Sequence, residues 1–289
     1  MNDRTYDRTH EDLGNIVGLE HVNLSHDDQQ RAILFYVVGL GLTRDPYVVV
    51  GLDNMWVNVG RNQFHLPTRG PQRLRGRVGV VLPDLDAVAK RLERVAKPLA
   101  GTAFAFERGD GFIDATCPWG NRLRLHPPSP AFGVSTLGIP YVQFDVAPDT
   151  AAGIVRFYRD LMDVPGKVET REGAPAAAIV VGKAQRLYYR ETDAPIAPYD
   201  GHHVQVYVAD FSGPHQKLSE RGLVFEESDQ YQYRFKDLID PETGKVLYTI
   251  EHEVRSVTHP LYARELVNRN PAQTNLAYVR NADRYGGTY

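Results

Sequence analysis

The feature that most constrains the fold is a short strand pattern that occurs four times along the chain. Each copy is followed by a segment with apolar residues at helical spacing, and then by shorter runs with β-like alternation. The four copies begin at His21, Arg77, Tyr141 and His203. A period of about fifty residues is typical of one supersecondary unit that has been copied along a chain. The sequence therefore predicts an α+β fold of four β-α-β-β-β units.

Helical segments are expected after all four strand starts. They span residues 33–38, 85–92, 154–161 and 215–222, and the first and third of them contain a Phe-Tyr pair. Each unit then has one helix and enough strands to form part of a sheet. We expect two modules, each closing a strongly curved, mostly antiparallel sheet around a cleft, with the helices outside.

The repeats divide the chain into four regions. Residues 1–15 are polar and are expected to form a mobile arm, and residues 16–130 a first module that ends in the proline-rich linker 127–130. Residues 138–254 are expected to form a second module, and residues 255–289 a C-terminal tail. Such a tail is expected to pack across a module or a neighbouring subunit, and the alternative is that it closes a site.

Composition favours a cytoplasmic protein that acts on small molecules. The chain is 42% hydrophobic and 24% charged, which is enough apolar material for two cores. A formal net charge of -3 predicts no basic surface for nucleic acid, and no long apolar run predicts a membrane span. The single cysteine, Cys117, excludes an internal disulfide. The expected partners are a small-molecule substrate and, in a homodimer, a second copy of the chain.

The ordered set of repeats resembles the vicinal oxygen chelate superfamily. The resemblance rests on the four units, on the Phe-Tyr pairs, and on the segments PWGNRL (118–123) and DPETGK (240–245), which lead into the last strands of two units. That superfamily contains glyoxalases, extradiol dioxygenases, epimerases and antibiotic-resistance proteins. The resemblance covers nearly the whole folded chain and implies two glyoxalase-like modules; it implies a fold more strongly than a reaction.

The resemblance also implies where a divalent metal would bind. In the family, the first position of a unit's first strand and a position on its last strand can supply ligands, and two units converge on one ion. Unit one offers His21 and His65, and unit four offers His203, with Tyr248 at the remaining position. Three imidazoles suit iron, zinc, nickel or manganese. The matching positions of units two and three hold no metal ligand.

Two pairings of the units are open. If unit one pairs with unit four, the three histidines converge at one site, as in tandem glyoxalase-like members. If unit one pairs with unit two, as in extradiol dioxygenases, the histidines are split between two incomplete sites. We favour the first pairing because every metal-capable histidine lies in the first or the last unit. The set lacks a carboxylate, and this disfavours extradiol cleavage.

The last strand of unit four offers three candidates for proton transfer, which are Tyr248, His252 and Glu251. Simple alternation places Tyr248 and His252 on one face, and Glu251 would join them only if a bulge reversed the strand phase. Substrate-binding candidates are the polar residues near the starts of the first strands, namely Asn23, Gln143, Gln205 and Tyr141.

These residues predict a metal-dependent enzyme acting on an oxygen-chelating small molecule. Isomerase or lyase chemistry follows most directly from a metal that polarises two neighbouring oxygens, and oxygenase chemistry is the variant with iron. Two alternatives use the same fold. One is a metal-free small-molecule-binding protein of the resistance type, and the other is a metal-free enzyme of natural-product metabolism. In both, His21 and His203 would be hydrogen-bonded core residues.

Overall fold

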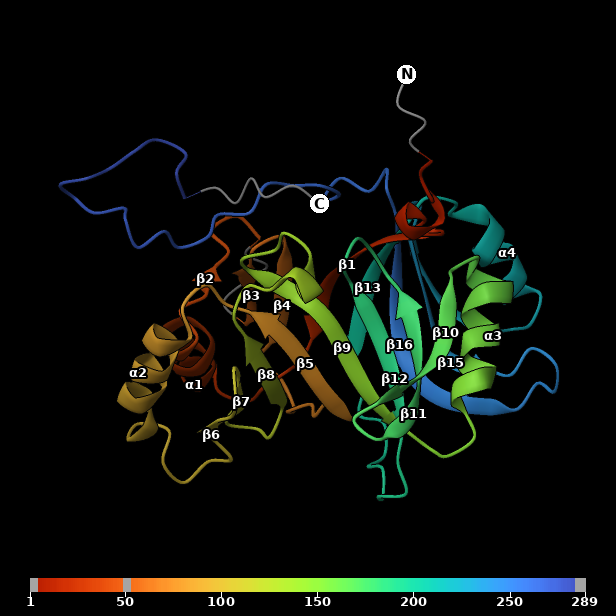
Figure 1. Cartoon of the computed structure of the whole chain (residues 1–289), viewed down its shortest axis with the longest axis horizontal. Helices are drawn as coiled ribbons and strands as arrows, with labels where there is room; N and C mark the ends of the chain where they lie inside the picture. Colours follow the sequence, from red (N-terminus) through yellow and green to blue (C-terminus); the bar gives the residue numbers. More distant parts are fainter. Residues whose placement is uncertain (1–4, 49–52, 284–289) are drawn as a thin grey trace.

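The computed structural model describes residues 5–48 and 53–283, and within these ranges the strands form two eight-stranded sheets (Figure 1). The first sheet combines units one and four. Its strands are β1 (Ile16–Asn23), β2 (Thr43–Arg44), β3 (Asn54–Val59) and β4 (Asn62–Pro67) from unit one, and β13 (His203–Val208), β14 (Val224–Asp229), β15 (Gln232–Ile239) and β16 (Val246–Ser256) from unit four. Their order across the sheet is β14-β15-β16-β13-β1-β4-β3-β2.

The second sheet combines units two and three in the same way. Its strands are β5 (Gly76–Val81), β6 (Ala105–Arg108), β7 (Ile113–Thr116) and β8 (Arg122–His126) from unit two, and β9 (Gly138–Val146), β10 (Gly166–Arg171), β11 (Ala174–Val180) and β12 (Arg186–Glu191) from unit three. Their order is β10-β11-β12-β9-β5-β8-β7-β6.

Within each unit, the first and last strands pair in parallel, and the first strands of two units pair antiparallel and so join the units. β1 lies parallel to β4 and antiparallel to β13, and β5 lies parallel to β8 and antiparallel to β9. The α+β fold of four units and the pairing of unit one with unit four are thereby confirmed. Figure 1 shows α1 and α2 on one side and α3 and α4 on the other, with the C-terminal tail running back over the first side, so each sheet joins units from the two halves of the chain. The boundaries 16–130 and 138–254, as limits of folding modules, stay a prediction.

The four predicted helical segments are helical. They correspond to α1 (Gln29–Ala32) with the π-helical continuation Ile33–Gly39, to α2 (Leu85–Ala96), to α3 (Ala151–Met162) and to α4 (Ser212–Ser219). In α2, the Asp84 side chain caps the helix by accepting a hydrogen bond from the amide of Ala87. α4 ends at Ser219, because residues 220–222 form a turn in which Gly222 has a φ of +66°.

One face of each sheet packs toward the other sheet. The ring of Tyr248 in β16 lies 5.9 Å from the rings of Phe144 in β9 and Tyr189 in β12, centroid to centroid. All three side chains are buried. Because strand side chains alternate between faces, the opposite face of each sheet is left to line a cleft.

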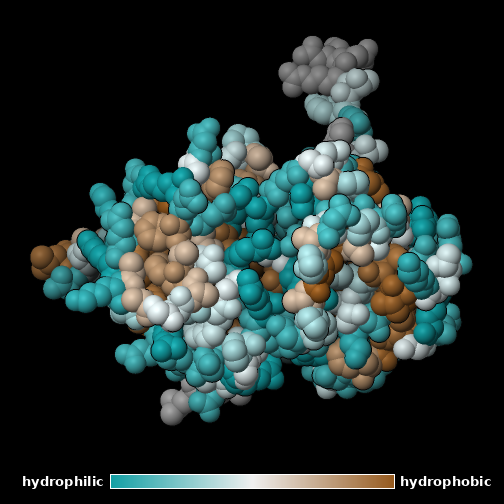
Figure 2. All heavy atoms as spheres, turned by 90° about the horizontal axis from the view of Figure 1, so that it is seen from below, coloured by the Kyte–Doolittle hydropathy of each residue, from teal (hydrophilic) through white to brown (hydrophobic). Residues whose placement is uncertain are grey.

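The C-terminal tail packs along the first sheet. The Asn58 amide in β3 donates a hydrogen bond to the backbone oxygen of Val267 (2.8 Å), and Arg264 forms an ion pair with Asp45 (2.8 Å). Residues 259–283 contain turns but no helix. None of the helices in the described residues has the length and apolar character needed to cross a lipid bilayer. On the face in Figure 2, hydrophilic residues predominate and hydrophobic residues form separate patches.

Candidate metal centre

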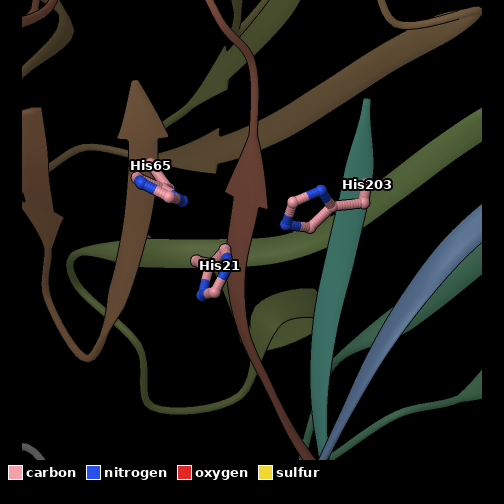
Figure 3. Close-up of side chains that lie close together, drawn as sticks. All are labelled: His21, His65 and His203. Carbon is pink, nitrogen blue, oxygen red and sulfur yellow. The ribbon is translucent and has the colours of Figure 1, made fainter. Parts of the chain in front are cut away.

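Three histidines from three neighbouring strands lie together on one face of the first sheet. Figure 3 shows His65 on β4, His21 on β1 and His203 on β13. One ring nitrogen from each lies within 4.8 Å of the other two. Strand register explains this grouping, because Asn23 in β1 is opposite both His65 and His203, and His21 precedes Asn23 by two residues on the same face.

A local irregularity in β1 orients His21. The pairing of β1 with β13 shifts register between Leu19 and His21, which allows Glu20 to lie on the same side as the histidine. The Glu20 carboxylate is 3.3 Å from Nδ1 of His21 and forms an ion pair with Arg255 (3.1 Å). Nε2 of His21 is buried and has no hydrogen-bond partner among the described residues. The ring therefore directs an unsatisfied nitrogen into the group.

The environment keeps His21 and His65 neutral. Burial holds the pKa of His21 well below its ordinary value, and the nearby Arg255 and His203 lower it further. Burial likewise lowers the pKa of His65 to about 2, with a contribution from the other two histidines. The ring of His65 is held by Asn54, whose Oδ1 lies 2.5 Å from Nε2, and by Trp56, which stacks on it at 3.8 Å. Neutral imidazole is the form that binds metals.

Glu253, a carboxylate that sequence reasoning missed, lies beside His203 at the edge of the group. Glu253 in β16 is opposite Gln205 in β13, just as His65 is opposite Asn23. Its Oε2 lies 3.5 Å from Nε2 of His203. Burial raises the pKa of Glu253, but the proximity of His203 and the charge of Arg255 outweigh burial and hold this pKa well below the ordinary value. The site thus contains a buried, ionised carboxylate beside three imidazoles.

Tyr248 does not lie at this position. Tyr248 follows Gly244 by the same interval as Arg124 follows Gly120, and this interval predicts that it shares the position. β16 is 11 residues long, whereas β8 has five, and the β15–β16 pairing contains two register shifts, so the site lies farther along the strand. The Tyr248 ring instead packs against the second sheet and against the Arg75 guanidinium, 4.2 Å from the ring centroid.

His252 is also on the wrong face to act in the cleft. Its ring stacks on Phe235 with centroids 4.5 Å apart. Its Nδ1 donates to the backbone oxygen of Ile250 (3.0 Å), and its Nε2 accepts from the Tyr158 hydroxyl (2.5 Å). Both ring nitrogens are therefore used within the core between β16 and α3.

Glu251 faces the cleft without any reversal of strand phase. Its Oε1 is 3.3 Å from Nδ1 of His203, and it forms an ion pair with Arg234. The error in the sequence analysis concerned which face of β16 carries the site. The missed signal was the alternation of charged residues at Glu251, Glu253 and Arg255, which puts all three on one face of the strand.

The predicted substrate-binding residues divide between the two sheets. Asn23 and Gln205 lie beside the histidines, and Oδ1 of Asn23 and both amide atoms of Gln205 are buried without hydrogen-bond partners among the described residues. Gln143 and Tyr141 lie in β9 of the second sheet, where Gln143 accepts a hydrogen bond from Arg171 (2.8 Å) and the Tyr141 hydroxyl is 2.9 Å from Nε2 of His126. They are not part of the histidine site.

A cavity of about 440 Å³ opens beside His203. Its lining is polar and includes Ser25, Arg69, Gln72, Arg234 and Glu251. This volume falls within the range of about 300 to 1,000 Å³ that is typical of small-molecule sites. A small polar compound can therefore reach His203 from solvent.

Solved structures share this fold. Glyoxalase I from Zea mays is 13% identical with a TM-score of 0.57, and the match covers 83% of this chain and 92% of that one. The cppA protein from Streptococcus pneumoniae TIGR4 is 12% identical with a TM-score of 0.50, and the match covers 84% and 99%. No protein-family model matches the sequence, and no curated protein matches it. At these identities the likeness concerns the fold.

Proposed function

We propose, from the premise that this chain has the fold of the vicinal oxygen chelate superfamily, that it is a metal-dependent enzyme acting on a small molecule with neighbouring oxygen atoms. One observation carries the proposal. Three imidazoles converge, the ionised carboxylate of Glu253 lies beside His203, and His203 lines a cavity. The Nε2 atoms of His21 and His203 are buried without hydrogen-bond partners among the described residues. Buried polar atoms are normally satisfied, so these nitrogens indicate a missing partner.

The residues present fit a divalent metal. His21, His65 and His203 would supply nitrogen ligands, and Glu253 an oxygen ligand. Such a set suits iron, zinc, nickel or manganese, with positions left for substrate. When bound, the ion would supply Lewis acidity toward two neighbouring substrate oxygens.

The surrounding side chains would bind the substrate and move a proton. Asn23 and Gln205 offer unsatisfied amide groups to substrate oxygens. Trp56, stacked on His65, forms an apolar wall that excludes water on that side. Glu251 is the one proton-transfer candidate that lines the cavity, and its carboxylate would accept a proton from the substrate and return it. A proton transfer of this kind corresponds to isomerase or lyase chemistry, and oxygenation is the iron-dependent variant.

Metal analysis of protein purified without chelator or affinity tag tests the proposal. We expect about one ion per chain, and His21→Ala or His203→Ala should each remove most of it, because three ligands hold an ion much more weakly than four. His215→Ala is the matched control, since His215 lies on α4 and pairs with Glu227 (2.6 Å).

Two results together would overturn the proposal. One is the absence of a stoichiometric ion from protein made in metal-supplemented medium. The other is that His21→Ala binds small ligands as the parent does. A metal-free binding protein of the resistance type, or a metal-free enzyme, would then take its place.

A further inference from the structure

The second sheet carries the same four repeat positions as the metal centre, but with other chemistry. Strand register assigns these positions to Arg77, Arg124, Tyr141 and Tyr188. Guanidinium groups are always charged and do not ligate metals, and neutral phenols are poor ligands. The face that corresponds to the metal site is therefore suited to bind a negative group.

Positive charge exceeds negative charge on this face. Three of its arginines form ion pairs with carboxylates: Arg124 with Asp114 (2.7 Å), Arg122 with Asp145 (2.8 Å), and Arg77 with Glu172. The positive charges of two further arginines are not balanced by a close carboxylate. Arg171 stacks on the Tyr188 ring at 3.8 Å and donates to Gln143, and Arg190 donates to two backbone oxygens and is 4.0 Å from Glu172.

A cavity of about 520 Å³ opens on the same face. Its walls carry five arginines, Arg73, Arg75, Arg77, Arg122 and Arg190, against two carboxylates, Asp145 and Glu172. The Nε atoms of Arg75 and Arg77 are buried and have no hydrogen-bond partner among the described residues. Leu74 and Ile196 add apolar surface. Unsatisfied guanidinium donors beside an apolar wall are the features of a site for an organic anion.

We propose that this cavity is a second binding site, which takes a small organic molecule bearing a carboxylate or phosphate group. The planar fork of a guanidinium matches both oxyanions. Within the described part of the chain, three lining arginines, Arg73, Arg75 and Arg190, make no side-chain hydrogen bond to a carboxylate. Arg75 packs against the rings of Tyr199 and Tyr248, so Arg73 and Arg190 are the two that we assign to the ligand. The hydrocarbon part of the ligand contacts Leu74 and Ile196. The site shares no lining residue with the cavity beside His203.

Calorimetric titration of the full-length, chelator-treated protein tests the proposal. The probes are inorganic phosphate and malonate, each at constant ionic strength maintained with potassium chloride. The variants are Arg190→Gln and the exposed Arg73→Gln, which removes a cation without disturbing the core. Arg186→Gln is the matched control, because Arg186 lies in β12 like Arg190 but outside the cavity, with its guanidinium on the backbone oxygen of Gln185 (2.8 Å).

We expect one equivalent of at least one probe to bind the parent. Arg190→Gln and Arg73→Gln should each weaken that binding about tenfold or more, and Arg186→Gln should bind as the parent does. Binding of phosphate alone would identify a phosphate site, and binding of malonate alone a carboxylate site. The proposal is overturned if neither probe binds the parent, or if both cavity variants bind as tightly as Arg186→Gln.

Discussion

Glu251 and Glu253 occupy alternate positions of β16, and both side chains contact His203 and Arg234. Glu253 is buried among the proposed ligands, whereas Glu251 lines the cavity. We therefore expect Glu253→Gln to weaken metal binding by at least about tenfold, because an amide is a poorer ligand than a carboxylate. Glu251→Gln should retain the metal and lose turnover.

Metal affinity measured by competition with a chelator distinguishes the two variants. Circular dichroism checks that Glu253→Gln remains folded despite the loss of charge beside Arg234 and Arg255. Equal metal affinity in the two variants would remove Glu253 from the ligand set.

The hydroxyl of Tyr248 is buried and has no hydrogen-bond partner among the described residues. Tyr248→Phe should leave metal content unchanged and leave the free energy of unfolding unchanged or raise it by up to about 1 kcal/mol, since an unsatisfied polar group is removed. Tyr158→Phe is the matched comparison, because the Tyr158 hydroxyl lies 2.5 Å from both Tyr189 and His252. Urea unfolding should show a loss of about 1 to 2 kcal/mol for that variant alone. A large loss for Tyr248→Phe would indicate that its hydroxyl has a partner in solution.

At the scale of elements, His252 links β16 to α3 and makes this contact sensitive to acid. Burial lowers the pKa of His252 to about 4, whereas an unfolded histidine titrates near 6.5. Between these values the unfolded chain binds the extra proton, so the contribution of His252 to stability is complete above about pH 6.5 and is lost as the pH falls toward 4. The loss amounts to about 3 kcal/mol.

Replacement of this histidine by glutamine isolates its effect from that of the other buried histidines. At pH 7, His252→Gln should lower the free energy of unfolding by about 1 to 3 kcal/mol, because the stack on Phe235 and the bond from Tyr158 are impaired. Near pH 4.5 the variant and the parent should differ much less. Urea unfolding at both pH values measures the free energies of unfolding of the two proteins. An equal difference at pH 7 and pH 4.5 would contradict a lowered pKa for His252.

At the scale of the whole molecule, each sheet and the candidate metal centre are shared between the two halves of the chain. His21 and His65 come from the first half, and His203 and Glu253 from the second. A fragment of residues 1–133 would expose the pairing edges of β1 and β5, so we expect it to associate with itself rather than remain monomeric.

Mixing this fragment with residues 134–289 should restore stoichiometric metal binding, which neither fragment alone should show. Size-exclusion chromatography and metal analysis of the separate and mixed fragments measure both effects. Full-affinity binding by the first fragment alone would contradict a site shared between the halves.

The four units, their helices and the three histidines can be predicted from the amino-acid sequence. These depend on periodicity within a strand or a helix, and such local patterns can be read directly from residues such as His21 and His203. The choice of unit one with unit four could also be inferred, because the histidines are confined to those units.

The carboxylate beside the histidines, that of Glu253, is visible only in the folded chain. The register between two strands depends on bulges, such as those near His21 and in the β15–β16 pair. A bulge adds a residue to one strand, so counting residues from the preceding turn does not predict which residue reaches the site. The site lies an odd number of residues farther along β16 than the interval after Gly244 predicts, so it falls on the face of Glu251 and Glu253 and not on the face of Tyr248 and His252. Gln143 and Tyr141, two of the predicted substrate-binding residues, lie in the other sheet, because unit three pairs with unit two.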